Sequence, residues 1–151
     1  MLTLEWAQAG LSWITVLKRR ENYKKTFDDF DVKTISKYSD EKLEQILKDE
    51  WIIRNRLKVW SVRKNARIFL NIQKEFWNFK KYLEIFTKGK VEKHRFENLR
   101  DYSTKNEISD AISRDLKKRW MSFVGSTIIY AYMQAIGIVD DHQPQCFCSK
   151  K

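Results

Sequence analysis

Four residues near the start of the chain could together hold a flat, electron-poor ring. Glu5 supplies a carboxylate, Trp13 an aromatic plane, and Leu11 an apolar tip next to the flexible Gly10, and all of them lie within about two helical turns. In a pocket, Trp13 would stack on the ring, Glu5 would hydrogen-bond or neutralise it, and Leu11 would press into the space beside it. The spacing also fits an ordinary helix in which Trp13 belongs to a buried stripe and Glu5 lies on the surface. Spacing alone favours this simpler interpretation.

A second group of side chains, close to the end of the chain, has the types that bind metal ions. His142 and Cys146 are spaced as half of a tetrahedral zinc site, which needs two more ligands from elsewhere. His94 is the only other histidine, and Cys146 and Cys148 are the only cysteines. On the chain alone, these counts favour an incomplete or absent metal site. A disulfide between two cysteines so close in the sequence would not stabilise the fold, so these cysteines fit a protein of a reducing compartment.

A third group is basic and could hold phosphates. Arg54, Arg56 and Lys58 open a predicted helix that extends to residue 70, and a short break that includes Ile53 separates it from a predicted helix over residues 40–49. Two helices joined by such a turn indicate a helix-hairpin-helix, in which the turn amides and the following helix N-terminus bind a phosphate without reading sequence. A solvated basic face explains the same three residues equally well.

The elements that position these groups are predicted to be helices throughout. The chain has 151 residues with one Pro and four Gly, and apolar residues recur at three and four positions, so we expect an all-α fold in a single domain. Asp40 and residues 104–107 carry capping signals for the helices that follow them. We expect further helices over residues 76–86 and 107–119, an exposed loop over 88–102, and a central core helix over 123–136 that ends at Gly137.

The charge balance favours an anionic partner. With 30 Lys and Arg against 20 Asp and Glu, the formal net charge is +10, which would raise the local concentration of a polyanion such as DNA. Charge alone supports a nucleic-acid partner only weakly, because many basic proteins bind nothing anionic. No apolar run is long enough to cross a membrane, and residues 1–5 lack the pattern of a signal peptide. We therefore expect a cytoplasmic protein with no membrane partner.

Several sequence blocks, in order along nearly the whole chain, resemble DNA-3-methyladenine glycosylase I. This is a bacterial base-excision repair family of the helix-hairpin-helix superfamily. Several blocks in the right order are far more specific than any single motif, and they reverse the preference for the simpler interpretation of Glu5 and Trp13. The matching blocks are QAGLSWITVL (8–17), RENY (20–23), IIRNR (52–56), NAR (65–67), KKR (117–119), FVGSTI (123–128), MQA (133–135) and DH (141–142) with Cys146.

The resemblance implies an enzyme that hydrolyses the N-glycosidic bond of 3-methyladenine in alkylated double-stranded DNA after flipping the base into a pocket. N3 methylation makes adenine cationic and therefore a good leaving group, so selectivity must come from the pocket rather than from a strong general acid. By resemblance, Glu5 is the catalytic carboxylate that hydrogen-bonds the base, and Trp13 stacks on it. We expect the protein to act as a monomer in the bacterial cytoplasm. The other implied roles are a DNA wedge (Gln8, Gly10, Leu11), phosphate contacts (Ile53, Arg54, Arg56, Lys58) and a structural zinc site (His142, Cys146).

One departure from the family pattern concerns the start of the chain. The family has roughly one more helical segment before the position of Met1, carrying a Cys and a His for zinc and a Tyr and a Trp for the base pocket. If Met1 is the true start, the resemblance implies an incomplete zinc site and a pocket that lacks one wall. The alternative function is then a catalytically impaired helix-hairpin-helix remnant that still binds DNA. A third is a helical interaction protein whose charge serves solubility.

The other departure is that four of the six tryptophans stand where the family usually has glycine. We interpret this as a coding effect, in which UGA codons that mean glycine in the source were translated as tryptophan. In the turn before Arg54, the residue at such a position is expected to need a positive φ, which tryptophan adopts only with strain. Reading the codons tests the interpretation, since UGG would count against it. The four positions are Trp6, Trp51, Trp77 and Trp120.

Overall fold

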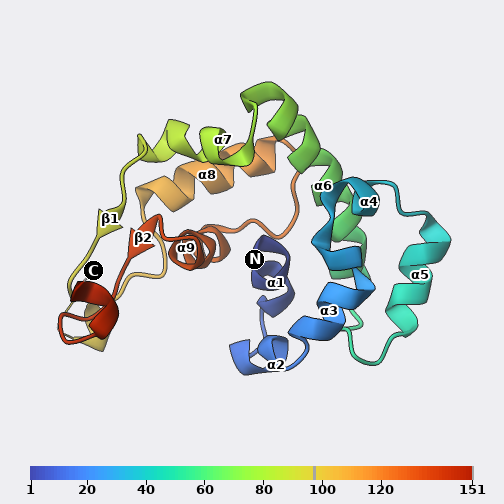
Figure 1. The fold of residues 1–151 in the computed structure, drawn as a ribbon, viewed down its shortest axis with the longest axis horizontal. Helices are drawn as coiled ribbons and strands as arrows, with labels where there is room; N and C mark the ends of the chain where they lie inside the picture. The colour runs from blue at the N-terminus through green and yellow to red at the C-terminus, as the bar shows by residue number, and fades with distance from the viewer. Residues whose placement is uncertain (97, 151) are drawn as a thin grey trace.

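Helix α6 (Arg56–Phe76) runs through the molecule and joins its two halves (Figure 1). The computed structural model describes residues 1–96 and 98–150. No helix in this described part is long and apolar enough to cross a membrane. The first half comprises α1 (Leu2–Gln8), α2 (Trp13–Leu17), α3 (Arg20–Thr26), the 3-10 turn η1 (Asp28–Phe30), α4 (Val32–Ser36) and α5 (Asp40–Lys48). The second half comprises α7 (Phe79–Thr87), β1 (Glu92–Lys93), η2 (Leu99–Asp101), α8 (Glu107–Lys118), α9 (Ser126–Ala135), β2 (Val139–Asp140) and η3 (Phe147–Lys150).

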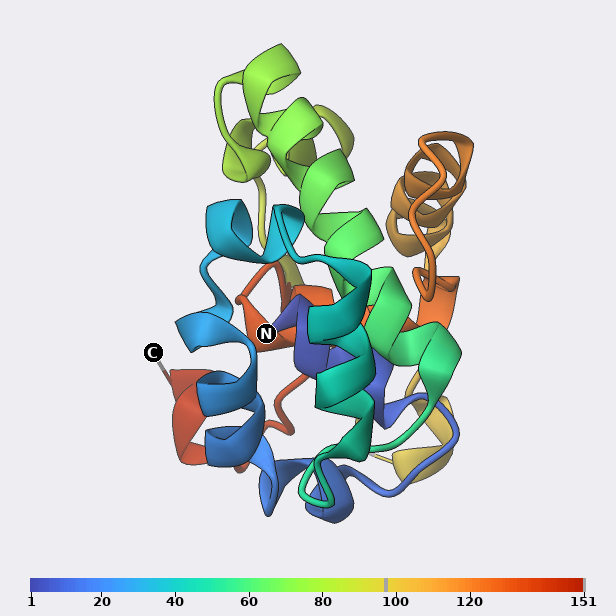
Figure 2. The ribbon, with the colours of Figure 1, turned by 90° about the vertical axis from the view of Figure 1, so that its right-hand side faces the viewer.

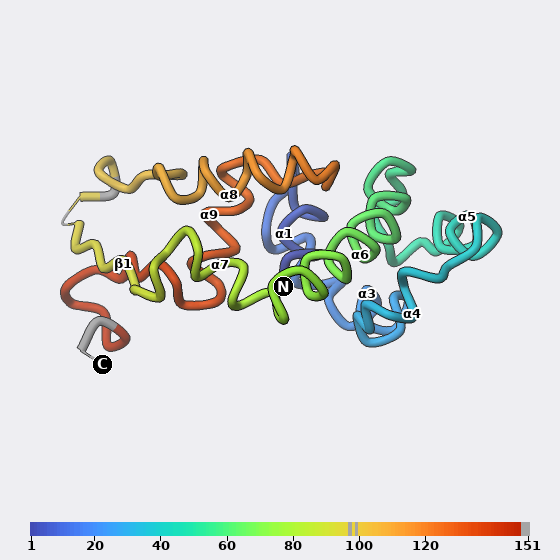
Figure 3. Tube along the Cα trace, turned by 90° about the horizontal axis from the view of Figure 1, so that it is seen from above, coloured from blue at the N-terminus to red at the C-terminus, as the bar shows by residue number. Residues whose placement is uncertain are grey.

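Each half has its own hydrophobic cluster, and α6 contributes to both. Val59 of α6 is buried with Val16 and Phe27 in the first cluster, whereas Ile72, near the other end of α6, is buried with Met133 of α9 in the second. Apolar side chains recur along α6 with the helical period, so this one helix can pack against both clusters. Seen from above, the two halves extend to opposite ends of the molecule, and α1 of the first half lies near the middle (Figure 3).

The all-α prediction is confirmed, with a small addition in the segment expected to be an exposed loop. There β1 pairs in parallel with β2, so that Glu92 lies opposite Val139 and Lys93 opposite Asp140. Strands of two residues are too short to show a period-two pattern in the sequence. The pairing ties this segment to the chain after Gly137, whose φ of 75° follows the end of α9 as expected. Residue 97 of the predicted loop lies outside the described residues.

Two helix caps differ from the prediction. Helix α5 is capped by Ser39, whose hydroxyl accepts from the Lys42 amide at 3.2 Å, and Asp40 is instead its first residue. Helix α8 is capped by Asn106 in a capping box with the residue three positions later, so Thr104 has no part in it. Serine and asparagine oxygens satisfy first-turn amides as well as aspartate or threonine oxygens do. The type of residue alone therefore does not decide which of two nearby candidates caps the helix.

The bounds of three helices differ from the prediction by more than one residue. Helix α6 starts two residues later than predicted, because Asn55 caps it by accepting from the Lys58 amide at 3.1 Å, and it extends beyond residue 70 to Phe76. As a result, the predicted helix over 76–86 becomes α7 and starts only at Phe79, after the cap residue Asn78. Helix α9 is shorter than the predicted span of 123–136 at both ends.

The four tryptophan positions singled out in the sequence are of different kinds. Trp77 follows α6 with a φ of 70° and is 91% exposed, and Trp120 follows α8 with a φ of 69° and is 77% exposed. A positive φ is costly for any residue with a Cβ, and glycine is common just after a helix. The prediction of a positive φ at Trp51 is wrong, because Trp51 is not among the residues with positive φ. Its amide donates to Asp49 Oδ1 at 2.9 Å in a turn. Trp6 is buried in the first cluster.

Candidate functional site

The turn between α1 and α2, which we call the wedge turn (residues 8–11), is braced internally and displays Leu11. Gly10 takes a φ of 76°, a conformation that residues with a Cβ rarely adopt. Gln8 braces the turn twice: its carbonyl accepts from the Leu11 amide at 2.7 Å, and its Nε2 donates to the Leu11 carbonyl at 2.7 Å. Leu11 is 38% exposed. The three residues predicted as a DNA wedge therefore form one connected unit with an apolar tip.

Lys58 holds the wedge turn from inside the protein. Its ammonium donates to the carbonyl oxygens of Ala7 at 2.9 Å and Ala9 at 2.6 Å, and the residue is buried. A cation stabilises the end of a helix, where the last carbonyls lack intrahelical partners. Burial lowers the pKa of Lys58. The ammonium is therefore bonded to the end of α1, and the phosphate contact predicted for Lys58 stays a prediction.

Glu5 and Trp13 line one pocket. The pocket has a volume of about 490 Å³ and is formed by α1, α2 and α9. The side chains from α9 are mostly small, which keeps the space between the helices open. Spacing alone did not join Glu5 to Trp13, whereas the family resemblance did. The lining residues are Met1, Glu5, Gln8, Trp13, Ala131, Gln134 and Ala135.

The Glu5 side chain lies in this pocket without an internal hydrogen bond. The residue is 6% exposed, and no hydrogen bond from the described residues reaches its carboxylate. Burial raises the pKa of Glu5, and the positive amino group of Met1 opposes the shift. A buried carboxylate without donors costs free energy. The interpretation that placed Glu5 on the surface is therefore wrong, and the pocket is complementary to a cation or a hydrogen-bond donor.

The α9 side of the pocket is tied to the C-terminal segment through Asp141. Gln134 lines the pocket, and its Nε2 donates to Asp141 Oδ2 at 2.7 Å. The same carboxylate accepts from the Tyr130 hydroxyl at 2.8 Å, and its other oxygen lies 2.7 Å from His94 Nδ1. Burial, together with the Asp141 carboxylate, raises the pKa of Tyr130. The sequence did not reveal this network, because His94 and Asp141 are 47 residues apart.

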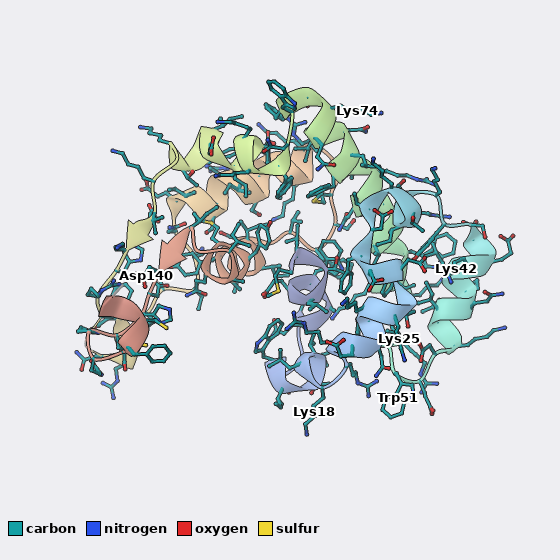
Figure 4. The ribbon with its side chains drawn as sticks, viewed as in Figure 1. Lys18, Lys25, Lys42, Trp51, Lys74 and Asp140 are labelled. Carbon is teal, nitrogen blue, oxygen red and sulfur yellow. The ribbon has the colours of Figure 1, made fainter. Side chains whose placement is uncertain are left out.

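The connection between α5 and α6 lies at the same edge of the molecule as the wedge turn. Figures 1 and 2 show α2 beside this connection, and Arg19 Nη1 donates to the Glu50 carbonyl at 2.8 Å. The side chains of Lys18, after α2, and Trp51, in the connection, point outward from this edge (Figure 4). The two segments that the sequence predicts to contact DNA therefore face the same side.

Within the connection, the predicted phosphate contacts differ in how available they are. The Arg54 side chain is exposed. Arg56 Nη2 lies 2.7 Å from Glu44 Oε1, in an ion pair whose side chains are 65% and 42% exposed. The Ile53 amide donates to the Tyr23 hydroxyl at 3.2 Å. Exposed ion pairs contribute little free energy, so Arg56 could exchange its partner for a phosphate at low cost.

The predicted metal-binding residues lie together in the C-terminal segment. His142 Nδ1 and Cys146 Sγ are 3.6 Å apart. Cys148 joins them in a group whose candidate ligand atoms all lie within 4.8 Å of one another. Imidazole and thiolate are ligands that Zn²⁺ prefers. His142 and Cys146 were predicted from the sequence, whereas Cys148 was not, although it lies only two residues after Cys146.

Known proteins match this chain over nearly its whole length. The family model described as methyladenine glycosylase matches residues 1–149. The DNA-3-methyladenine glycosylase of Haemophilus influenzae is 42% identical over 147 residues, which are 97% of this chain and 80% of that protein. The DNA-3-methyladenine glycosylase 1 of Escherichia coli is 40% identical over 148 residues, which are 98% of this chain and 79% of that protein.

Solved structures agree with these matches. A crystal structure of a 3-methyladenine DNA glycosylase I superposes with a TM-score of 0.93 at 41% identity, covering 97% of this chain and 81% of that one. A variant of such an enzyme in complex with 3-methyladenine gives a TM-score of 0.94 at 28% identity, covering 99% and 81%. Family model, sequence relatives and fold therefore agree, and the chain belongs to the methyladenine glycosylase family.

Proposed function

We propose that this chain removes 3-methyladenine from alkylated double-stranded DNA by hydrolysing the bond between the base and deoxyribose. The observation that carries the proposal is the buried Glu5 carboxylate, which lines a pocket with Trp13 and receives no hydrogen bond from the described residues. The names of the relatives and of the solved structures support the same activity.

Selectivity follows from charge. Adenine methylated at N3 in DNA is a cation, whereas unmodified adenine is neutral. A cation beside Glu5 favours the ionised carboxylate and offsets the cost of its burial. Trp13 offers a face on which the flipped ring stacks, with an added attraction for its positive charge. Unmodified adenine brings no positive charge to compensate the buried carboxylate, so the pocket discriminates against it.

The reaction itself needs little chemical help from the protein. When the bond between C1′ and N9 breaks, its electron pair stays with the base, which leaves as neutral 3-methyladenine. A water oxygen forms the new bond to C1′, and the water gives up a proton to solvent. The part of Glu5 and Trp13 is to hold the extruded base in position until the bond breaks.

The wedge turn and the connection before α6 would engage the duplex. Leu11 would fill the gap that the flipped base leaves, which offsets part of the unstacking cost. The hydrogen bonds of Gln8 and Lys58 keep this turn in shape. We further propose that α5, the connection and α6 act as a helix-hairpin-helix, with Arg54 and Arg56 on the phosphates. The net charge of +10 assists binding without adding sequence preference.

A structural zinc ion is also part of the proposal. The imidazole of His142 and the thiolate of Cys146 fit its preferences, and these two residues would hold it. Such an ion would supply folding free energy to the C-terminal segment. The monomeric state and the bacterial cytoplasmic location stay predictions.

Release of free base from alkylated duplex DNA tests the function directly. We expect wild-type protein to release 3-methyladenine, detected by chromatography, and Trp13→Ala to release it much more slowly. Trp77→Ala is the matched control, because Trp77 is exposed and lies outside the pocket. A folded protein that binds the duplex without releasing base would overturn the enzymatic function and favour the DNA-binding alternative. Binding that does not weaken with salt would contradict both.

A further inference from the structure

We infer that Lys58 is a positioning residue for base extrusion, because it fixes the wedge turn to α6 and thereby determines where Leu11 meets the duplex. The observation behind this inference is that the Lys58 ammonium binds two carbonyl oxygens at the turn. The inference rests on the wedge proposed above and names the residue through which the wedge is held. It does not depend on base release, so it can fail while the glycosylase function stands.

The carbonyl oxygens at the end of α1 show what Lys58 contributes. A helix leaves its last four carbonyls without intrahelical donors. Backbone amides of the wedge turn reach the Trp6 carbonyl at 3.3 Å and the Gln8 carbonyl at 2.7 Å. The alternate carbonyls, those of Ala7 and Ala9, accept from the Lys58 ammonium at 2.9 Å and 2.6 Å. Lys58 therefore completes the hydrogen bonding with which α1 ends and the turn begins.

Lys58 is itself held firmly at the start of α6. Its amide donates to Asn55 Oδ1 at 3.1 Å, and its carbonyl accepts from the Ser61 hydroxyl at 2.7 Å. The next residue, Val59, is buried in the first cluster. Asn55 directly follows Arg54, which we propose as a phosphate contact. The first turn of α6 thus links the wedge turn to the segment that would hold the DNA backbone.

The same link also places the wedge relative to the base pocket. Glu5 lies on α1, two residues before Ala7, whose carbonyl Lys58 binds. An extruded base can reach Glu5 only when the tip of the wedge, Leu11, stands at the gap that the base has left. One cation therefore fixes the helix that carries the pocket carboxylate and the turn that carries the tip.

The type of residue suits this task. Lys58 is 9% exposed, and no ion pair within the described part of the chain includes its ammonium. The negative end of the α1 dipole offsets part of the cost of burying the cation. Hydrogen bonds from a charged donor are about twice as strong as neutral ones. Two such bonds would keep the turn in place when Leu11 presses between base pairs.

Binding to a duplex that contains a stable abasic analogue tests this role, since the missing base leaves the gap that Leu11 would fill. We expect wild-type protein to prefer this duplex to an undamaged one, as measured by anisotropy at one salt concentration. Leu11→Ala and Lys58→Met should each lower the preference about tenfold. The double variant should also lose only about tenfold, because Lys58 acts through Leu11, whereas independent contacts would together lose about 100-fold. Lys74→Met is the control, because it removes an exposed charge at the other end of α6 (Figure 4).

The phosphate contact predicted for Lys58 leads to a different result. Lys58→Met would then weaken binding to both duplexes equally and lower the slope of log affinity against log salt concentration by about one. That result, or additive losses in the double variant, would overturn the inference. A preference that survives in Leu11→Ala would overturn the wedge and this inference together. Base release from alkylated duplex, measured on the same wild-type protein, tells separately whether the glycosylase function stands.

A second measurement on the wild-type chain avoids the risk that Lys58→Met fails to fold. Acetic anhydride labels lysine amines that are free, and mass spectrometry after digestion reads each position. We expect Lys58 to be labelled slowly both with and without undamaged duplex, because its ammonium is bonded inside the protein. Lys74 is exposed and should be labelled fast in both cases. Fast labelling of Lys58 that the duplex suppresses would overturn the inference in favour of the phosphate contact.

Discussion

The carboxylates of Asp141 and Glu5 are both buried, and their surroundings are opposite. The Asp141 side chain is 5% exposed and is contacted by a hydroxyl, an amide and an imidazole. Glu5 is 6% exposed, and its carboxylate receives no hydrogen bond from the described residues. Buried charges are normally paired or hydrogen-bonded. Asp141 follows this rule within the fold, whereas Glu5 would follow it only when a ligand enters the pocket.

The difference separates a structural role from a functional one. The partners of Asp141 come from α9 and from the chain beyond β1, so its charge joins two segments of the second half. Glu5 receives no such hydrogen bond from the described residues, and its burial disfavours the ionised carboxylate. Natural sequences keep such costs where function requires them. Changes at Glu5 should therefore affect activity more than stability, and changes at Asp141 should do the reverse.

The largest expected effect is the loss of activity in Glu5→Gln. The amide keeps the shape of the side chain and removes the charge that attracts the cationic base. We expect base release from alkylated duplex DNA to fall on the order of 100-fold, as when one partner of a buried charge pair is lost. Binding to undamaged duplex, measured by anisotropy at the same salt concentration, should stay within about twofold. Equal losses of release and of DNA binding would contradict a contact between Glu5 and the base.

Asp141→Ala should instead destabilise the fold. It leaves the Tyr130 hydroxyl, Gln134 and His94 without their common partner. Of these three residues, Tyr130 is buried whereas Gln134 is exposed, so the unsatisfied Tyr130 hydroxyl should account for most of a cost of about 1–3 kcal/mol. Urea unfolding measures this loss, and Glu5→Gln serves as the comparison because it should not lower the free energy of unfolding. A stable Asp141→Ala protein without activity would reverse the roles assigned to the two carboxylates.

The sequence predicted only part of the contrast between the two carboxylates. Few breakers and a clear helical period predicted the all-α fold, since both are local properties of the chain. The pocket pair Glu5 and Trp13 was reached through family resemblance, because spacing alone favoured a surface position for Glu5. The network of Asp141 could not be predicted, since its partner His94 becomes a neighbour only after β1 pairs with β2.

Lys58 shows that residue type alone does not determine which groups a predicted DNA-contact residue binds within the fold. Basic residues at the start of a helix usually face solvent or a phosphate, and Arg54 is indeed exposed. Lys58 lies one turn further along, where α6 passes the end of α1, and its ammonium binds the Ala7 and Ala9 carbonyls. The packing of α1 against α6 decides this, and such tertiary contacts leave no local sequence pattern.

The pH dependence of base release tests the functional role of Glu5. Burial raises the pKa of Glu5, and only the ionised form attracts a cation. Base release at limiting DNA should therefore decline by about tenfold per pH unit below this raised pKa, and Glu5→Gln should lack this acid limb. The uncatalysed release at each pH is subtracted as the control. An acid limb at the same pH in both proteins would show that another group titrates.

The same pKa shift predicts how stability depends on pH. The folded state holds the Glu5 proton more tightly than the unfolded state does. The stabilisation from this proton is fully present below the unfolded pKa and is lost as pH rises through the raised folded pKa. Glu5→Gln should therefore gain stability relative to wild type as pH rises from below the unfolded pKa of Glu5 through its raised folded pKa. An unchanged difference across this range would contradict the burial of Glu5.

The smallest expected effect concerns the stability of the fold in which both carboxylates lie. Trp77 and Trp120 have positive φ just after helices and are largely exposed, so each loses more from backbone strain than it gains from packing. Replacing either by Gly should raise the free energy of unfolding by about 1 kcal/mol. Trp51→Gly is the matched control, because Trp51 is also exposed but lacks a positive φ, and it should give no gain in the free energy of unfolding.

Combining Trp77→Gly with Trp120→Gly would give Asp141→Ala enough stability to stay folded. The activity of Asp141→Ala could then be compared directly with that of Glu5→Gln. A loss of stability in Trp77→Gly and Trp120→Gly would mean that the tryptophans are needed where they stand, and would remove the structural support for glycine at these positions.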